Sequence, residues 1–160
     1  MASGEQIAIY LNDHLAGSTA ARDLVERTAS DAEGSALGTF LGTLLRDIEE
    51  DRSELRSVMQ RLDVEEQAVK QVAGAVAERA SRVKFDVIDR GGGDLNRVLE
   101  LESMLMGIEG KAALWRTLKE LAKTEPRLDG IDLDELVSRA GRQQTDVERH
   151  RVALLSSAFR

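Results

Sequence analysis

Polar side chains stand at several mid-helix positions where the spacing of apolar residues predicts a core side chain. These residues are His14, Asp51, Arg52, Glu102, Glu109, Gln144, Glu148 and Arg151. A charge that is buried without a partner is costly, so those that lie inside must pair with one another. Carboxylates form ion networks with guanidinium and imidazole groups, and carboxylates with imidazoles also bind iron or manganese. The sequence therefore indicates a polar network or a metal site, although Glu102 and Glu109 fit a solvent margin equally well.

A metal site is the less favoured of these two interpretations. In helical bundles, two bridged metals take one Glu from each of two helices and a Glu-x-x-His pair from each of the other two. No Glu-x-x-His occurs in this sequence, and Arg52 stands where a histidine would have to follow Glu49. Because an arginine supplies a positive charge instead of a lone pair, we predict a carboxylate–Arg/His network and no cofactor.

Two alternatives to this network remain open. An irregular metal site would bind iron or manganese through His14, Glu50, Glu109 and Glu148. A small-ligand or lipid site would instead need a cavity beside Met104, Met106 and the valines of residues 69–87. Serine or cysteine catalysis has no support, because the chain contains no cysteine and no Gly-x-Ser-x-Gly motif. We therefore expect a protein that is not an enzyme.

Five helices are expected to position these side chains. Apolar residues make up 42% of the sequence and aromatic residues only 3%, which is typical of a helical core built from aliphatic side chains. The apolar residues recur every three or four positions, and this spacing predicts amphipathic helices. These helices are expected over residues 4–29, 36–62, 64–89, 95–124 and 133–158.

Capping residues mark the expected helix boundaries. Capping-box pairs stand at three helix starts: Ser3 with Gln6, Asp63 with Glu66, and Asp132 with Glu135. The pair at Asp63 predicts a third helix that begins directly after the second. Three glycines at 91–93 are expected to end this helix, Asp94 to cap the next one, and Pro126 to stop it.

The helix predicted over residues 95–124 is expected to be the most buried. One apolar stripe on it consists of Val98, Leu101, Leu105, Ile108, Ala112, Trp115 and Leu118. A second stripe beside it consists of Leu95, Leu99, Met106 and Ala113. Two stripes need apolar neighbours on more than one side, which predicts a central position. Gly107 and Gly110 share one face, where the lack of side chains favours a close helix crossing or a bend.

Four segments of the chain carry a resemblance to a known family. They are YLNDHLAG, LLRDIEEDR, LELESMLMGIEGKAALW and RQQTDVERHR. Together with the length of the chain and its paired long helices, they resemble the ferritin-like superfamily, and within it a bacterial group of small bundles without the Glu-x-x-His motifs. This resemblance implies an all-α fold: an antiparallel ferritin-like four-helix bundle with one additional helix, in a single domain of residues 1–160.

Charge and hydropathy limit the expected partners. A net charge of −7 repels phosphate backbones, and acidic residues interrupt the basic run of residues 79–90, so we expect no nucleic acid. No stretch of about 18 apolar residues occurs and no basic leader begins the chain, so neither a membrane span nor export is expected. The absence of cysteine fits a reducing compartment and a cytoplasmic location. The sequence leaves homo-oligomer formation open.

Overall fold

The computed structural model describes residues 4–67 and 93–160, which are all-helical and contain no strand. Four long helices lie along the molecule: α1 (Gly4–Asp31), α2 (Ala36–Arg61), α4 (Asp94–Leu121) and α5 (Leu133–Ala158). A short 3-10 helix, η1 (Pro126–Leu128), lies between α4 and α5. The helices predicted over 4–29, 36–62, 95–124 and 133–158 are confirmed, with ends that differ by up to three residues.

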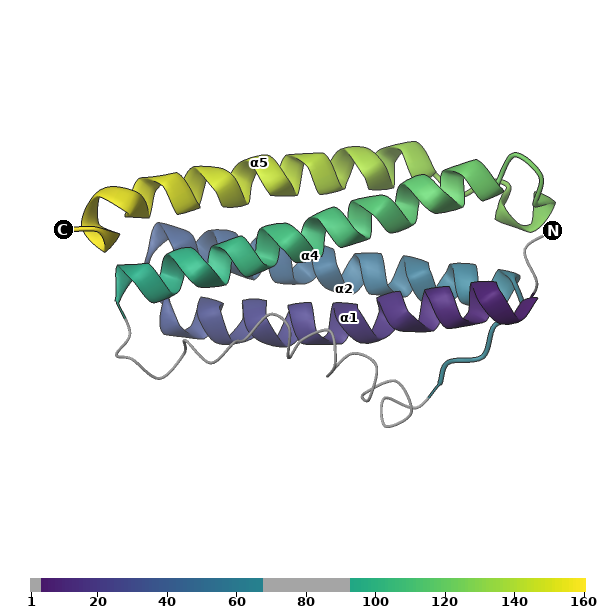
Figure 1. Cartoon of the computed structure of the whole chain (residues 1–160), viewed down its shortest axis with the longest axis horizontal. Coiled ribbons are helices and arrows are strands. Elements are labelled where there is room, and N and C mark those ends of the chain that lie inside the picture. The colour runs from purple at the N-terminus through teal and green to yellow at the C-terminus, as the bar shows by residue number, and fades with distance from the viewer. Residues whose placement is uncertain (1–3, 68–92) are drawn as a thin grey trace.

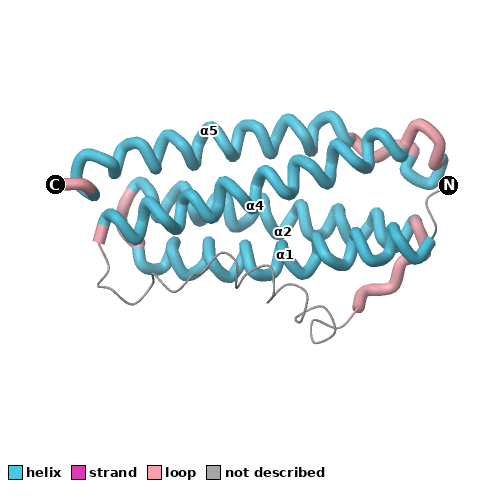
Figure 2. The backbone as a smooth tube through the Cα atoms, viewed as in Figure 1, coloured by secondary structure: helices cyan, strands magenta, loops and turns pink. Residues whose placement is uncertain are grey.

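The four long helices form two hairpins that pack side by side (Figure 1). α1 and α2 are antiparallel neighbours, and so are α4 and α5. α2 and α4 run in the same direction, as the chain colours in Figure 1 and the tube in Figure 2 show. The order of directions is therefore up, down, down, up, and one long connection must join the two hairpins.

Side chains cap the starts of two of the long helices, and one of these caps, Asp132, was predicted. Ser35 accepts a hydrogen bond from the amide of Gly38 at 3.0 Å and begins α2, after a turn in which Gly34 has a φ of 79°. Asp132 accepts a hydrogen bond from the amide of Glu135 at 3.0 Å, as its capping box predicts. Side-chain acceptors of this kind satisfy amide groups that have no partner inside the helix.

The capping box predicted at Asp63 is wrong. Asp63 has a φ of 57°, so it forms the left-handed turn that ends α2, and residues 64–67 are not helical. Asn12 of α1 holds this segment on both sides: its Nδ2 donates to the carbonyl of Glu65 at 3.0 Å, and its Oδ1 accepts from the amide of Gln67 at 2.8 Å. The rest of the helix predicted over 64–89 lies outside the described residues, as does Ser3.

The boundaries of α4 also differ from the prediction. Gly93 is its N-cap and makes no side-chain hydrogen bond, so Asp94 lies inside the first turn instead of capping it. α4 already ends at Leu121, so Pro126 is not the residue that stops it. Pro126 instead begins η1. A proline fits the first turn of a helix because its missing N–H would have no partner there.

The core consists of two apolar clusters, one toward each end of the bundle. The first contains Leu11, Leu15, Leu55, Val58, Met59, Leu62, Val64, Leu114, Trp115, Leu118, Leu128, Leu133 and Leu136. The second contains Leu24, Val25, Leu41, Leu44, Ile48, Leu101, Met104, Ile108, Ala112, Ala140 and Val147. All four long helices contribute to each cluster, so burial of both clusters holds the two hairpins together.

α4 is not more buried than its neighbours, contrary to the prediction. α2 and α4 each bury eight side chains, although α2 is the shorter helix. The second predicted stripe faces outward at two positions, because Leu95 is 45% exposed and Met106 is 56% exposed. Leu105 of the first stripe is only partly buried. α4 therefore has one buried face, as a helix at the surface of a bundle does.

Candidate functional site

A layer of polar side chains lies between the two apolar clusters, at the middle of the bundle. At its centre is Asp51 of α2, whose side chain is 5% exposed. Lys111 Nζ of α4 lies 2.5 Å from Asp51 Oδ2, and Arg139 Nη2 of α5 donates to Asp51 Oδ1. Both carboxylate oxygens are thus in ion pairs, which is the condition under which a charge can be buried at low cost.

Other side chains extend this layer across α2 and α5. Gln143 accepts from Lys111 Nζ through its Oε1 and donates through its Nε2 to Asp47 Oδ2 at 3.1 Å. Arg139 Nη1 donates to Glu50 Oε2 at 3.0 Å, near the surface. We call this set the polar layer; its members are Asp47, Glu50, Asp51, Lys111, Arg139 and Gln143. It links three helices, and each member is hydrogen-bonded to another member, although Arg139 Nε is buried without a partner in the described part of the chain.

The two cations of the polar layer differ in their protonation energetics. Burial lowers the pKa of Lys111, and attraction to Asp51 offsets this only in part. Burial also acts to lower the pKa of Arg139, but attraction to Asp51 and Glu50 outweighs it, so that the pKa of Arg139 is raised. Of these two cations, Lys111 is therefore the one whose positive charge the surrounding residues compensate less.

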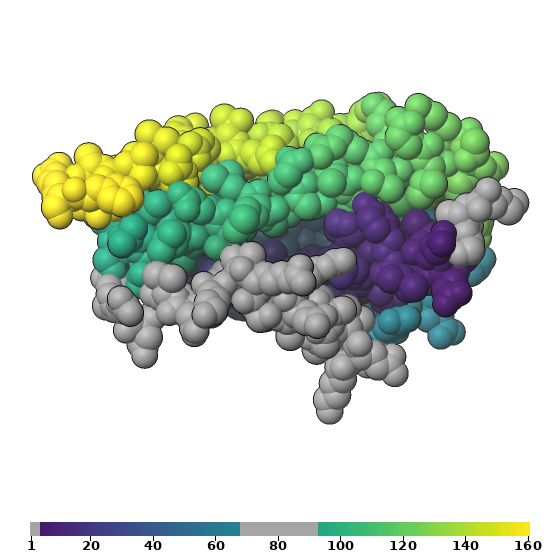
Figure 3. Space-filling model, viewed as in Figure 1, coloured from purple at the N-terminus to yellow at the C-terminus, as the bar shows by residue number. Residues whose placement is uncertain are grey.

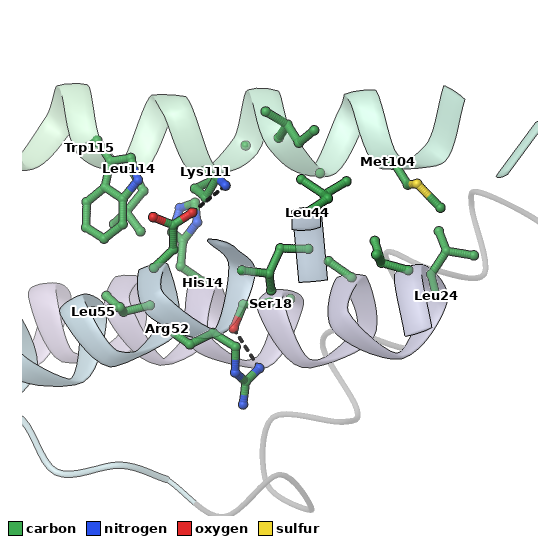
Figure 4. Close-up of a pocket in the computed structure, with 18 of the residues that line it drawn as sticks. His14, Ser18, Leu24, Leu44, Arg52, Leu55, Met104, Lys111, Leu114 and Trp115 are labelled. Carbon is green, nitrogen blue, oxygen red and sulfur yellow. Dashed lines mark hydrogen bonds and ion pairs between the residues drawn. The ribbon is translucent and has the colours of Figure 1, made fainter. Parts of the chain in front are cut away.

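Arg52 is buried beside Asp51 but does not belong to the polar layer. Its Nη1 donates to Ser18 Oγ at 3.0 Å (Figure 4) and to Thr19 Oγ1 at 2.9 Å, both on α1. Successive helical residues point about 100° apart, so Asp51 faces α4 and α5 while Arg52 faces α1. The expectation that Arg52 would neutralise the inner carboxylates is wrong, because Lys111 and Arg139 do so.

Burial is the main cause of the lowered pKa of Arg52, with repulsion from Arg56 as the next cause. Glu49 is its nearest carboxylate, with 3.6 Å between Glu49 Oε2 and Arg52 Nε. That Nε is buried and has no hydrogen-bond partner in the described part of the chain. The two α1 hydroxyls therefore carry most of the polar contact that Arg52 makes.

The other predicted network residues lie along the outer margin between α4 and α5. Arg151 Nε lies 2.7 Å from Glu148 Oε2, and its Nη1 lies 3.2 Å from Glu102 Oε1. Gln144 Nε2 donates to Glu109 Oε2 at 2.8 Å. A hydrogen bond from Arg151 lowers the pKa of Glu148. These residues bind α4 to α5 at the surface and are not part of the polar layer.

Glu109 shows why this margin differs from the polar layer. Its side chain is 56% exposed and its pKa is lowered by hydrogen bonds from Arg116 first and Gln144 second. Water screens such exposed pairs, so each contributes little to stability. Of the residues predicted for the network, only Asp51 is a member of the polar layer, and Glu50 of the alternative metal set joins it.

His14 lies on α1, on the side of the bundle away from α5. Its ring meets the ring of Tyr10 edge-on, with 4.6 Å between the centroids. The second histidine, His150 of α5, stacks on Phe40 with 4.5 Å between the centroids. Burial lowers the pKa of His150, and repulsion from Arg149 adds to this. The two histidines thus make separate aromatic contacts and are not part of one site.

A metal ion does not fit the polar layer. Both oxygens of Asp51 face cationic side chains, and a divalent ion would have to displace Lys111 and Arg139 from them. The structure does not bring together the alternative ligands His14, Glu50, Glu109 and Glu148. Within residues 4–67 and 93–160, no three His, Cys, Asp or Glu side chains lie close enough to hold a metal.

Lys111, Arg139 and Gln143 were not identified from the sequence, but two of them stand on apolar stripes. Lys111 interrupts the stripe Met104, Ile108, Lys111, Trp115, Leu118. Gln143 interrupts the stripe Leu136, Ala140, Gln143, Val147. A polar residue on a stripe of this spacing faces the core of a helical bundle. This signal would have identified both residues, whereas nothing in the spacing distinguishes Arg139.

A cavity of about 250 Å³ adjoins the polar layer, between α1, α2 and α4. Figure 3 shows a recess between α1 and α4 with α2 at its bottom. Toward one end, the walls of the cavity carry His14, Ser18, Asp51, Arg52, Lys111 and Trp115. Toward the other end, the walls are apolar and consist of Leu24, Val25, Leu44, Ile48, Met104 and Ile108. The cavity therefore has a polar end and an apolar end.

Glycines and small side chains create this space. Gly17 of α1 and Gly107 and Gly110 of α4 line the cavity, together with Ala21. A Cβ at Gly107 would lie 3.9 Å from the Cβ of Ala21, and one at Gly110 would meet nothing within 4 Å. Gly107 therefore lies close to Ala21 of α1, and Gly110 lines the cavity with no described residue within 4 Å of its Cβ position.

Trp115, like Arg52, contributes to the cavity wall a polar atom that has no hydrogen-bond partner among the described residues. The indole nitrogen of Trp115 is buried and makes no hydrogen bond in the described part of the chain. Trp115 is 1% exposed and lines the polar end of the cavity, where Figure 4 shows its nitrogen on the side of the ring that faces Lys111. Buried N–H groups nearly always have an acceptor, so the cavity is the place where one would bind.

Comparisons of the chain with models of protein families, with curated proteins and with solved structures found no match. None of the helices in the described ranges has both the length and the hydropathy that crossing a membrane requires. The polar layer and the cavity are therefore the features from which a function can be inferred.

Proposed function

We propose that this protein is a non-catalytic helical bundle that binds a small, mainly apolar ligand in the cavity between α1, α2 and α4. The cavity itself carries the proposal. Its volume of about 250 Å³ exceeds the roughly 150 Å³ of an engineered apolar cavity that binds benzene. A molecule of about ten non-hydrogen atoms fits this space.

The composition of the walls supports binding of an amphipathic molecule. In a mainly apolar pocket, a few polar groups fix the orientation of the ligand by binding its polar group. Here the apolar end would hold the body of the ligand, and the polar end, at Lys111 and Trp115, would hold its polar group. Met104 lies in this wall, whereas Met106 is exposed on α4 and is not part of it.

We also propose that the polar layer stands where ferritin-like bundles bind their metals. The helix directions and the one long connection between hairpins support this, because ferritin-like folds have one such crossover. Asp51 lies mid-bundle among side chains of three helices, as a metal ligand would. Lys111 and Arg139 provide the positive charge there instead of a metal.

A fluorescence titration tests the ligand-binding proposal. Trp115 is the only tryptophan and lies in the cavity wall, so its emission reports on an occupant. Titration with 1-octanol is expected to give a saturable change in emission, with a dissociation constant below about 1 mM, and to raise the melting temperature.

The matched variants are Gly107→Leu, which places a side chain in the cavity, and Gly141→Leu, on the exposed part of α5 outside it. Gly107→Leu is expected to abolish the saturable signal, and Gly141→Leu to keep it. The proposal fails if 1-octanol gives no saturable signal, or if folded Gly107→Leu binds it as the unmodified protein does.

A further inference from the structure

The polar end of the cavity offers hydrogen-bond donors. The Trp115 indole is a donor only, and its N–H has no hydrogen-bond partner among the described residues. The Lys111 ammonium has three N–H groups, and its described hydrogen bonds go to Asp51 and Gln143. A ligand group that accepts two hydrogen bonds would be recognised by these two side chains.

The acceptor groups of Asp51 and Ser18 at the polar end already receive hydrogen bonds from the protein. Both oxygens of Asp51 receive hydrogen bonds from Lys111 and Arg139. The Ser18 hydroxyl accepts from Arg52 Nη1 and donates to the carbonyl of Leu15 at 2.6 Å. A ligand amine would therefore have to break an existing ion pair, whereas a ligand anion would not.

Two cationic and two acidic side chains line the cavity: Lys111, Arg52, Asp13 and Asp51. Asp51 is already paired with Lys111 and Arg139, and Arg52 Nη1 donates to Ser18 and Thr19. Burial lowers the pKa of Lys111, and attraction to Asp51 offsets this only in part. A negative group bound at the remaining N–H of Lys111 would supply the missing compensation.

We infer that the ligand is a monocarboxylate with a short apolar body, whose two oxygens accept from Trp115 Nε1 and Lys111 Nζ. This inference rests on the proposed function and names its ligand class. A carboxylate has two acceptor oxygens in one plane, which matches two donors from one helix. A phosphate ester has more charge and more acceptors than the two donors of this mainly apolar cavity can satisfy.

The two donors come from one face of α4. Lys111 and Trp115 are four residues apart on α4, so their side chains lie on the same face one turn apart. Figure 4 shows both at the same end of the cavity, with Met104 and Leu24 at the other end. The carboxylate would sit at the polar layer and the apolar body would extend toward Met104.

Three probes with the same apolar chain separate the contributions of charge. Octanoate is expected to bind at least about tenfold more tightly than 1-octanol, because hydrogen bonds to a charged group are stronger than those to a neutral one. Octylamine is expected to bind more weakly than 1-octanol. Isothermal titration calorimetry measures all three without relying on the tryptophan.

Trp115→Phe keeps an aromatic ring at this position and removes the unpartnered N–H together with the pyrrole part of the indole. We expect it to reduce octanoate affinity by about three- to tenfold. The control is Tyr10→Phe, which removes a hydroxyl bonded to Thr117 outside the cavity and should leave the affinity unchanged. Lys111→Gln is expected to abolish the preference for octanoate over 1-octanol.

The outcomes distinguish the two proposals. If 1-octanol binds as tightly as octanoate, or octylamine binds best, the carboxylate inference is overturned and the ligand-binding proposal stands. If octanoate affinity is equal in Trp115→Phe and in the unmodified protein, the assigned contact is wrong even if Lys111→Gln does not fold. If none of the three probes binds at millimolar concentration, both proposals fail.

Discussion

The two sides of α4 differ in how they are packed. Toward α5, α4 makes its most extensive contact, and ion pairs such as that of Arg151 with Glu102 close the margin. Toward α1, its contact is smaller, and Gly107 and Gly110 line the cavity. Among the described residues, the side of α4 toward α5 is therefore its packed side, and the side toward α1 is its open side.

Replacement of Asp51 is expected to lower the free energy of unfolding more than any other change proposed here. Asp51→Ala leaves Lys111 and Arg139 without their shared carboxylate, and an uncompensated buried charge costs about 3–5 kcal/mol. Denaturant unfolding followed by circular dichroism measures this loss. Glu50→Ala is the control, because Glu50 pairs with the same arginine but is 67% exposed, and it is expected to cost less than about 1 kcal/mol. Equal losses in the two variants would contradict the buried position of Asp51.

The packed side of α4 is expected to be sensitive to truncation. Leu101 is fully buried in the same apolar cluster as Val147 of α5, so Leu101→Ala should cost about 2–5 kcal/mol. Leu105→Ala should cost less, since Leu105 is only partly buried, and Met106→Ala should be nearly silent at 56% exposure. Chemical denaturation of the three variants gives this order, and any other order would mean that α4 faces the core differently.

The open side of α4 is expected to gain stability from a methyl group. Gly110→Ala adds a Cβ that meets nothing within 4 Å, so reduced chain entropy should raise the free energy of unfolding by about 0.5–1 kcal/mol. Gly38→Ala is the contrasting variant, because its Cβ would lie 2.3 Å from the carbonyl oxygen of Ala32. Thermal unfolding should show opposite shifts. A destabilised Gly110→Ala would indicate that the space beside α4 is smaller than described.

The exposed ion pair of Arg127 with Glu125 is expected to shift the pKa of Glu125 but to add little to the stability of the fold. Hydrogen bonds from Arg127 lower the pKa of Glu125 to about 2. Because the folded pKa is the lower one, this pair stabilises the protein above the ordinary pKa of about 4.3, and the effect is lost as the pH falls toward 2. Arg127→Ala should return the Glu125 pKa toward 4.3 in an NMR titration, with little effect on unfolding at neutral pH. A large loss of stability in Arg127→Ala would contradict the expected difference between this exposed ion pair and the buried ion pairs of Asp51.

The helices were predictable because their signals are local. Ser35 with its turn, and Asp132 with Glu135, mark helix starts through hydrogen bonds that span only three residues. The capping box at Asp63 does not start a helix, because residues 64–67 make a non-local contact instead. Asn12, more than fifty residues away, pairs with the backbone of Glu65 and Gln67. A short capping motif cannot anticipate such a partner.

The site was predictable in part for the same reason. The stripe of α2 passes through Asp51 and Arg52, and both are buried. Which helix each one faces depends on the rotation of α2 against its neighbours, and so does the choice of Lys111 as a partner. The glycines of α4 were expected to allow a close helix crossing or a bend; Gly107 lies close to Ala21 of α1, and both glycines line the cavity.

By itself, the sequence determined the helical class, four of the helices, and the presence of charged residues on the core face of α2. These follow from periodicity and capping, which act over a few residues. Only the tertiary structure decided the pairing of Asp51 with Lys111 and Arg139, the outward position of Met106, and the cavity beside Trp115. Pairing and cavities depend on distances between helices, and many helix arrangements bury the same apolar stripes equally well.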